Sequence, residues 1–134
     1  MARQKKILDA SVALKWFFKE KGSNIADNIL KAHINEDIVI IVPELFFYEV
    51  TNALRFQHKN VEELKAAIND LEIMQLSIEK YSFELIKLAV ENALKYKLTV
   101  YDSLYLTLAE KLNAKLVTAD EAIILSKHPL VESL

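Results

Sequence analysis

The sequence predicts an α/β domain in which a central parallel sheet is flanked by helices. Short runs rich in β-branched residues alternate four or five times with helical patterns of apolar residues, which is typical of parallel strands joined by right-handed crossovers. Residues 38–42 form an unbroken β-branched run, as expected for a strand that is buried on both faces. Because 134 residues suit one core, we expect a single domain over residues 1–134.

The first half of the chain predicts two strands and four helices. Ser11 is the candidate N-cap of the first helix, because serine oxygens readily accept the free N–H groups at a helix start. Pro43 suits the first position of a long helix, and Asn60 separates that helix from the next. In chain order, we expect a strand at 6–9, a helix after it, a helix from 25 until 36–37, a strand at 38–42, and helices at 43–59 and 61–73.

The second half of the chain continues the alternation. Ser82 is a candidate N-cap, and the regular three- and four-residue spacing of apolar residues over 100–112 strongly indicates a helix. In chain order, we expect a strand at 74–78, a helix after Ser82 to about 96, a helix at 100–112, a strand at 115–118, a helix at 120–126 and an edge strand at 130–134. In such sheets, ligands bind beyond the carboxyl ends of the strands.

Composition excludes several classes of function. The chain has no cysteine, which removes thiol chemistry, and a single glycine, Gly22, which argues against phosphate-binding glycine loops. Seventeen Lys and Arg against 19 Asp and Glu give a net charge of −2, so any contact with nucleic acid must be local. Pro43, Glu44 and Glu49 interrupt the longest apolar stretch, and the N-terminal segment does not resemble a signal peptide. We therefore expect no membrane segment and a cytoplasmic location.

Two acids follow strands directly and are expected at the same edge of the sheet. Asp9 ends the strand at 6–9, and Asp120 comes just after the strand at 115–118. Taken singly, each acid is better explained as the cap of the helix that follows it. Together they are harder to explain by capping alone, because the ligand-binding edge of a parallel sheet is where both would lie.

Two further acids lie on helices that border this edge. Glu49 has apolar neighbours one turn away, so we expect it to be protonated, paired with a lysine or bound to a cation. Asp102 begins the helix at 100–112, where it is also explained as a first-turn acid, and Glu44 is interpreted as complementing the helix dipole. Four converging carboxylates would repel one another unless divalent cations intervened, and oxygen ligands favour Mg²⁺ or Mn²⁺. Such a site suits phosphodiester cleavage.

Four short motifs around these acids resemble those of PIN-domain nucleases, in particular the compact toxin subunits of VapBC-type toxin and antitoxin pairs. They are ILDASV at 7–12, PELFFYEVTNAL at 43–54, YDSLYL at 101–106 and LVTAD at 116–120. The resemblance covers nearly the whole chain. The chain departs from the family at Asn113, where relatives often have glycine. Asparagine tolerates a left-handed backbone, so this change is compatible with the fold.

The resemblance implies a three-layer PIN-like fold with about five parallel strands in the order 3-2-1-4-5. It also implies that Asp9, Glu49, Asp102 and Asp120 are the catalytic and metal-binding acids. Ser11 and Thr118 would support them, and Asn52 would lie close by. The implied reaction is Mg²⁺- or Mn²⁺-dependent hydrolysis of RNA phosphodiester bonds by water, without a protein nucleophile.

The resemblance further implies a homodimer and a small antitoxin protein whose C-terminal segment covers the site. Lys15, Lys19, Arg55 and Lys59 are candidates for contacts to RNA phosphates, although each is also explained as part of a solvated helix face. The helix at 61–73 and its neighbour are candidates for an apolar dimer surface. The aromatic residues of 16–18 and 46–56 are interpreted mainly as core, and the three histidines, His33, His58 and His128, as surface or packing residues.

Three other readings of the acids remain. The first is a PIN-like module that binds RNA or a protein without cutting. The second is an aspartyl-phosphate phosphatase, but such enzymes use a second Asp two residues after the nucleophile, where this chain has Ser11. The third is a phosphoacceptor domain, which would want adjacent acids after its first strand, and Asp9 has no acidic neighbour.

Overall fold

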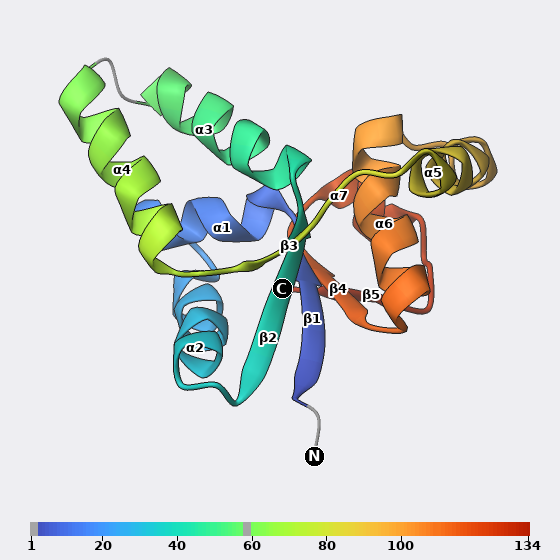
Figure 1. The fold of residues 1–134 in the computed structure, drawn as a ribbon, viewed down its shortest axis with the longest axis horizontal. Helices are drawn as coiled ribbons and strands as arrows, with labels where there is room; N and C mark the ends of the chain where they lie inside the picture. The colour runs from blue at the N-terminus through green and yellow to red at the C-terminus, as the bar shows by residue number, and fades with distance from the viewer. Residues whose placement is uncertain (1–2, 58–59) are drawn as a thin grey trace.

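A computed structural model describes residues 3–57 and 60–134 and shows a five-stranded parallel sheet (Figure 1). The strand order is β3-β2-β1-β4-β5, as the resemblance implied, and all four neighbouring pairs run parallel. The strands are β1 (Gln4–Leu8), β2 (Ile38–Pro43), β3 (Ser77–Glu79), β4 (Lys115–Thr118) and β5 (Val131–Ser133). The α/β prediction is therefore confirmed.

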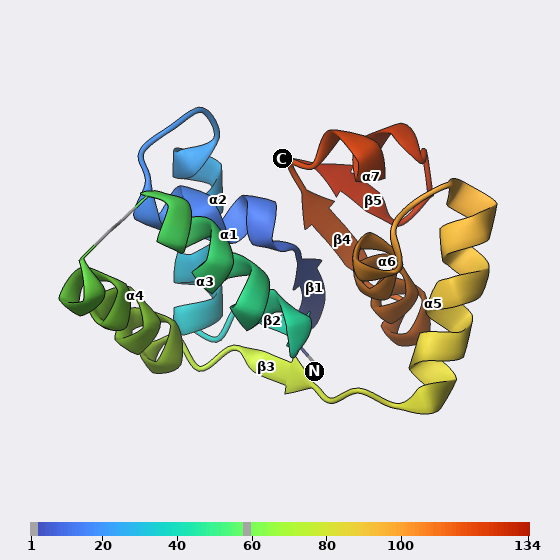
Figure 2. The same ribbon diagram turned by 90° about the horizontal axis from the view of Figure 1, so that it is seen from above.

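Helices cover both faces of this sheet, which gives three layers. Figure 2 shows α1 to α4 on one side of the strands and α5 and α6 on the other. The helices are α1 (Ala10–Phe17), α2 (Ser23–Ile34), α3 (Leu45–Gln57), α4 (Val61–Ile73), α5 (Phe83–Tyr96), α6 (Val100–Leu112) and α7 (Glu121–Leu125). None of the helices in the described ranges is long and apolar enough to cross a bilayer.

Several boundaries agree with the local signals in the sequence. The bounds of α4, α6 and β4 are those predicted, and Ser82 caps α5 by accepting a hydrogen bond from the Leu85 N–H at 3.0 Å. Asn113 ends α6 with a φ of 48°, in the left-handed region that asparagine tolerates. These elements are specified by capping residues and by apolar periodicity, both of which act within one or two turns of chain.

Several details of the predicted elements are wrong. The strand expected at 74–78 lies at Ser77–Glu79, because Met74 still ends α4 and Gln75 turns the chain with a φ of 50°. Pro43 does not begin a helix but ends β2 opposite Glu79, because the fixed φ of proline also suits the end of a strand. Glu44 precedes α3, and its Oε1 accepts the Tyr81 N–H at 2.8 Å instead of acting within the first turn. The N-cap of α1 is Asp9 instead of Ser11. The predicted end of α3 at Lys59 lies outside the described residues.

The core lies where the two helical layers meet the sheet. Ile7, Leu8, Ile40, Leu116 and Val117 on the three central strands are almost wholly buried, as expected when a parallel sheet is covered on both faces. This packing fixes the direction of β1 and β4, and hence the position of the residues that follow them.

The histidine and aromatic interpretations are partly confirmed. His33 and His128 are buried packing residues, and His33 joins β2 to α4 through the Ile40 N–H (3.0 Å) and the Met74 carbonyl (3.1 Å). His58 lies outside the described residues. Among the aromatic residues Phe46 is core, but Tyr48 and Phe56 on α3 are 75% and 78% exposed, so the core interpretation is wrong for these two.

Candidate active site

Asp9 and Asp120 lie beyond the carboxyl ends of the two central strands β1 and β4. Leu8 pairs with Val117, so the next residue on each strand, Asp9 and Thr118, continues the same register. Asp9 follows β1 directly, and Asp120 is the N-cap of α7 two residues after β4. The sheet order places β1 and β4 side by side, which brings the two acids to one edge of the sheet.

Two hydroxyl groups hold the Asp9 carboxylate. Ser11 Oγ donates to Oδ1 at 2.5 Å, and Thr118 Oγ1 donates to Oδ2 at 2.6 Å. Each hydroxyl also accepts a backbone N–H from the β4–α7 connection, Ser11 from Ala119 and Thr118 from Asp120, both at 2.9 Å. The carboxylate of Asp9 is therefore fixed from both strand ends, and the supporting positions expected for Ser11 and Thr118 are consistent with these bonds.

The buried position of Asp9 disfavours the charged form of its carboxyl group. Asp9 is 4% exposed, and burial raises the pKa of its carboxyl group to about 6, opposed by the hydrogen bonds from Ser11 and Thr118 and reinforced by the charge of Asp120. A buried carboxylate of this kind is held at a cost in free energy unless a cation accompanies it. Shifted carboxyl groups of this type are concentrated at functional sites.

Glu49 and Asp102 reach the same region from helices on opposite sides of the sheet. Oε1 of Glu49 on α3 accepts a hydrogen bond from the Tyr105 hydroxyl at 2.5 Å. Burial and the charges of Asp102 and Asp120 raise the pKa of the Glu49 carboxyl group. Asp102 lies in the first turn of α6, where Thr99 is the N-cap, and its pKa is raised by burial and by the charge of Asp120. The charge of Asp120 thus acts on each of the other three acids.

The simpler explanations of these acids hold only in part. Asp120 does cap α7, since Oδ1 accepts the Ile123 N–H at 3.2 Å, and Asp102 is a first-turn acid. Asp9 occupies an N-cap position, but its side chain makes no capping hydrogen bond. Within the described parts of the chain, none of the four acids forms an ion pair with Lys, Arg or His, so the lysine partner considered for Glu49 is not seen there.

The donor set fits a hard divalent cation. The four acids offer only carboxylate oxygens, and no basic side chain among the described residues neutralises them. The charge of Asp120 raises the pKa of Asp9, Glu49 and Asp102. In residues 3–57 and 60–134, no three Asp, Glu or His side chains are already arranged to chelate an ion together. A bound cation would offset the repulsion that keeps such carboxylates apart.

The expected peripheral residues differ in their surroundings. Asn52 lies exposed on α3, one turn beyond Glu49, and Lys19 and Arg55 are also exposed. The ammonium group of Lys15 donates to Glu20 at 3.0 Å and to the Lys21 carbonyl at 2.7 Å, so it is already engaged within the loop after α1. Lys59 lies outside the described residues.

Tyr105 was not singled out from the sequence, although it contacts a candidate ligand. It is 1% exposed on α6 and belongs to the apolar pattern that predicted this helix. The available signal was chemical, because a buried tyrosine usually needs a partner for its hydroxyl group. The partner is 56 residues away in sequence, so only the folded chain identifies it.

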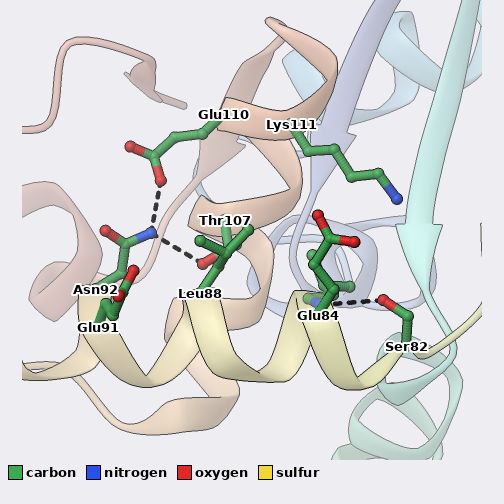
Figure 3. A pocket seen from close by; sticks show the side chains of 9 residues that line it. Ser82, Glu84, Leu88, Glu91, Asn92, Thr107, Glu110 and Lys111 are labelled. Carbon is green, nitrogen blue, oxygen red and sulfur yellow. Dashed lines mark hydrogen bonds between the residues drawn. The ribbon is translucent and has the colours of Figure 1, made fainter.

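A hollow of about 420 Å³ between α5 and α6 is separate from the acids (Figure 3). Asn92 is buried there, and its Nδ2 donates to Thr107 Oγ1 at 2.9 Å and to Glu110 Oε1 at 2.6 Å. Glu110 Oε2 lies 3.1 Å from His128 Nε2. None of the four candidate acids lines the hollow, and its polar groups join α6 to α5.

Comparison with known families identifies the class of protein. A family model described as PIN domain matches residues 6–127, so the chain belongs to the PIN-domain family. The chain is 30% identical over 125 residues to Ribonuclease VapC3 of Pyrobaculum aerophilum, covering 89% of this chain and 92% of that protein. Within the family, the chain is thus similar to VapC-type proteins, as the motifs implied.

Solved structures share the fold. One is VapBC2 from Rickettsia felis, bound to a DNA fragment from its promoter, with a TM-score of 0.72, 18% identity and coverage of 98% of this chain and 99% of that one. Another is Mycobacterium tuberculosis VapC20, described as a sarcin-ricin loop cleaving toxin, with a TM-score of 0.71, 11% identity and coverage of 95% and 98%. At these identities the likeness concerns the fold.

Proposed function

We propose that this chain is a divalent-metal-dependent endoribonuclease and the toxin of a toxin–antitoxin pair. The observation that carries the proposal is the buried Asp9, held by two hydroxyl groups. The charge of Asp120 acts on Asp9, Glu49 and Asp102, and none of these acids has a basic partner among the described residues. Membership of the PIN-domain family supports the proposal, as does the similarity to a protein named as a ribonuclease.

Asp9, Glu49, Asp102 and Asp120 would hold Mg²⁺ or Mn²⁺, which lowers the pKa of water and neutralises charge on a phosphate. The chain's own contribution is to orient these acids and, at Asp9, to oppose by hydrogen bonds the effect of burial on the pKa. Ser11 and Thr118 donate to both oxygens of Asp9, which favours its charged form in a buried position. Four carboxylates repel the phosphate groups of RNA. RNA would therefore bind at these acids only when a cation is bound there as well.

RNA would be held by polar groups around the acids. Lys19 and Arg55 are exposed and free to contact phosphates flanking the cleaved bond, and Asn52 lies one turn beyond Glu49 on the same helix. We assign Lys15 a smaller part, because its ammonium group is engaged by Glu20 and the Lys21 carbonyl. We place this activity in the cytoplasm and in a single domain.

Protein partners would use the apolar surface of α3 and α4. These two helices pack against each other and expose large apolar side chains, namely Tyr48, Phe56, Val61, Ile68 and Ile73. Exposed apolar groups of this number on a small domain favour a protein contact. We propose that two copies of this chain form a homodimer through this surface. We also propose that a segment of an antitoxin covers the four acids, in keeping with the VapBC complexes among the structural neighbours.

The proposal is tested by incubating purified protein and end-labelled RNA with Mn²⁺, with Mg²⁺ and with a chelator, beside an Asp9→Asn variant. We expect metal-dependent cutting by the wild type and none by the variant, because Asn keeps the shape of Asp9 but removes its charge. Circular dichroism checks that both are folded. Equal cutting by the two proteins would refute the acid site. If neither cuts, the substrate is a particular folded RNA or the chain is a binding module. A rise of the melting temperature with Mn²⁺ in the wild type alone would then show that the cation site is intact.

A further inference from the structure

Tyr105 joins the two helical layers at the carboxyl edge of the sheet. We call this edge the acid edge, because the candidate acids Asp9, Glu49, Asp102 and Asp120 lie there. Glu49 belongs to α3, which packs on α1, α4 and β2, whereas Tyr105 belongs to α6, which packs on α5 and on β1, β2 and β4. The two helices approach the carboxyl edge from opposite sides of the sheet (Figure 2). The hydrogen bond from the Tyr105 hydroxyl to Glu49 Oε1 therefore connects elements that otherwise belong to different layers.

The hydroxyl group of Tyr105 lies among three of the candidate ligands. Burial, the hydrogen bond to Glu49 and the charges of Glu49, Asp9 and Asp102 all raise the pKa of this hydroxyl well above its usual range. Each of these three carboxylates is therefore near enough to act on it. The phenol stays protonated in such surroundings, so it serves as a neutral hydrogen-bond donor inside a cluster of acceptors.

Glu49 has the longest and most flexible side chain of the four acids. Asp9 is held by two hydroxyl groups, and Asp120 by the Ile123 N–H of the helix that it caps. Glu49 has a longer side chain with more rotatable bonds, and it loses more conformational freedom when it is fixed. Among the described residues, Tyr105 is the one group that donates a hydrogen bond to it, at Oε1.

We propose that Tyr105 is a positioning residue whose hydroxyl holds Glu49 in the orientation that completes the cation site. The inference rests on the proposed metal-dependent function and adds a residue to it. Tyr105 fixes Oε1 of Glu49 by this hydrogen bond, so that Oε2 would be held in a defined position for the cation. Groups that orient metal ligands in this way strengthen metal binding without touching the ion.

The test compares Tyr105→Phe with Tyr101→Phe, which removes the same hydroxyl from an exposed position on the same helix. The dissociation constant for Mn²⁺ is measured by calorimetry on the purified full chain without RNA, and melting temperatures are taken in chelator. We expect Tyr105→Phe to weaken Mn²⁺ binding roughly 10-fold, as loss of an orienting partner typically does. Tyr101→Phe should leave the constant unchanged.

A second comparison separates positioning from general support of the fold. Both tyrosine variants are repeated in a Glu49→Gln background, where the carboxylate that Tyr105 orients is gone. If Tyr105 acts through Glu49, its removal has no further effect on Mn²⁺ binding in that background. If Tyr105→Phe weakens Mn²⁺ binding by the same factor with Glu49 and with Gln at position 49, the inference is overturned. It is also overturned if Tyr105→Phe lowers the melting temperature but leaves Mn²⁺ binding unchanged. A wild type that does not bind Mn²⁺ would instead refute the proposed function itself.

Discussion

The chain contains two clusters of partly buried polar side chains that are built in opposite ways. In the hollow between α5 and α6, donors and acceptors alternate: Asn92 donates to Thr107 and Glu110, and the second oxygen of Glu110 pairs with His128 (Figure 3). At the carboxyl edge of the sheet, four carboxylates gather with hydroxyl and backbone N–H groups as their donors.

The difference separates a structural cluster from a chemical one. A structural cluster satisfies its polar groups internally, so it stabilises the packing of two helices and needs nothing further. The acid edge leaves like charges uncompensated by the described residues, and this costs stability in the absence of a cation. Polar burial alone is thus a poor guide to function, whereas uncompensated charge of one sign is a better one.

The sharpest test exchanges a carboxylate for an amide in each cluster. Asp120→Asn should reduce RNA cleavage by at least about 100-fold, because loss of a metal-binding acid should cost no less than the upper end of what loss of a ligand's orienting partner costs. Asparagine caps helices as well as aspartate does, so α7 should persist. Glu110→Gln should change cleavage by less than roughly twofold, as for most surface substitutions. Initial rates on one RNA substrate measure both. Equal losses would abolish the distinction between the clusters.

The free energy of unfolding should depend on pH, because the buried carboxyl group of Asp9 destabilises the metal-free protein when it is charged. Burial raises the pKa of Asp9 to about 6, above the value of 3.8 of an ordinary aspartate, so the folded protein holds this proton more tightly than the unfolded chain does. The free energy of unfolding of metal-free protein should therefore fall by roughly 2–3 kcal/mol as pH rises from about 4 to above 6. Urea denaturation at a series of pH values measures it.

Asp9→Asn is the control for this pH dependence, because asparagine does not titrate. Its stability should change less over the same range, and at pH 7 without metal it should exceed that of the wild type. Parallel curves for the two proteins would show that Asp9 does not carry an electrostatic cost.

The structural cluster should matter for stability and not for catalysis. Asn92→Ala removes the donor shared by Thr107 and Glu110 and should lower the free energy of unfolding by about 1–2 kcal/mol. The turnover rate of the folded protein should stay the same. Glu91→Ala, an exposed neighbour on α5, serves as the control and should have a much smaller effect on stability. A large loss of turnover in Asn92→Ala would link the two clusters.

The smallest expected effects concern the basic residues that are candidates for contacts to RNA phosphates. Lys19→Ala and Arg55→Ala should each weaken RNA binding a few-fold and reduce the slope of log affinity against log salt by about 1 if each contacts one phosphate. Lys15→Ala should leave the slope unchanged, because its ammonium group is already engaged by Glu20 and the Lys21 carbonyl. Fluorescence anisotropy at several salt concentrations distinguishes these cases.

Local signals in the sequence determined most of the elements and the positions of two acids. Apolar periodicity and the caps Asn60, Ser82 and Thr99 define where helices begin, because each acts within a few residues of chain. The unbroken apolar run of β2 predicted a sheet covered on both faces. Asp9 and Asp120 were found because each follows a strand directly, and the resemblance to PIN domains supplied the strand order.

The tertiary structure decided which groups surround those acids. Ser11 is a frequent N-cap residue type, yet the fold directs its hydroxyl to Asp9 and to the Ala119 N–H. The hydrogen bonds of Asp9 with Thr118 and of Glu49 with Tyr105 join residues that are 109 and 56 positions apart. Contacts over such separations leave no local pattern, because they depend on how strands and layers pack. The sequence by itself therefore determined most of the elements and the two acids at the strand ends. The burial and the hydrogen bonds that shift the pKa of Asp9 were decided only by the packed fold, because they depend on contacts between distant parts of the chain.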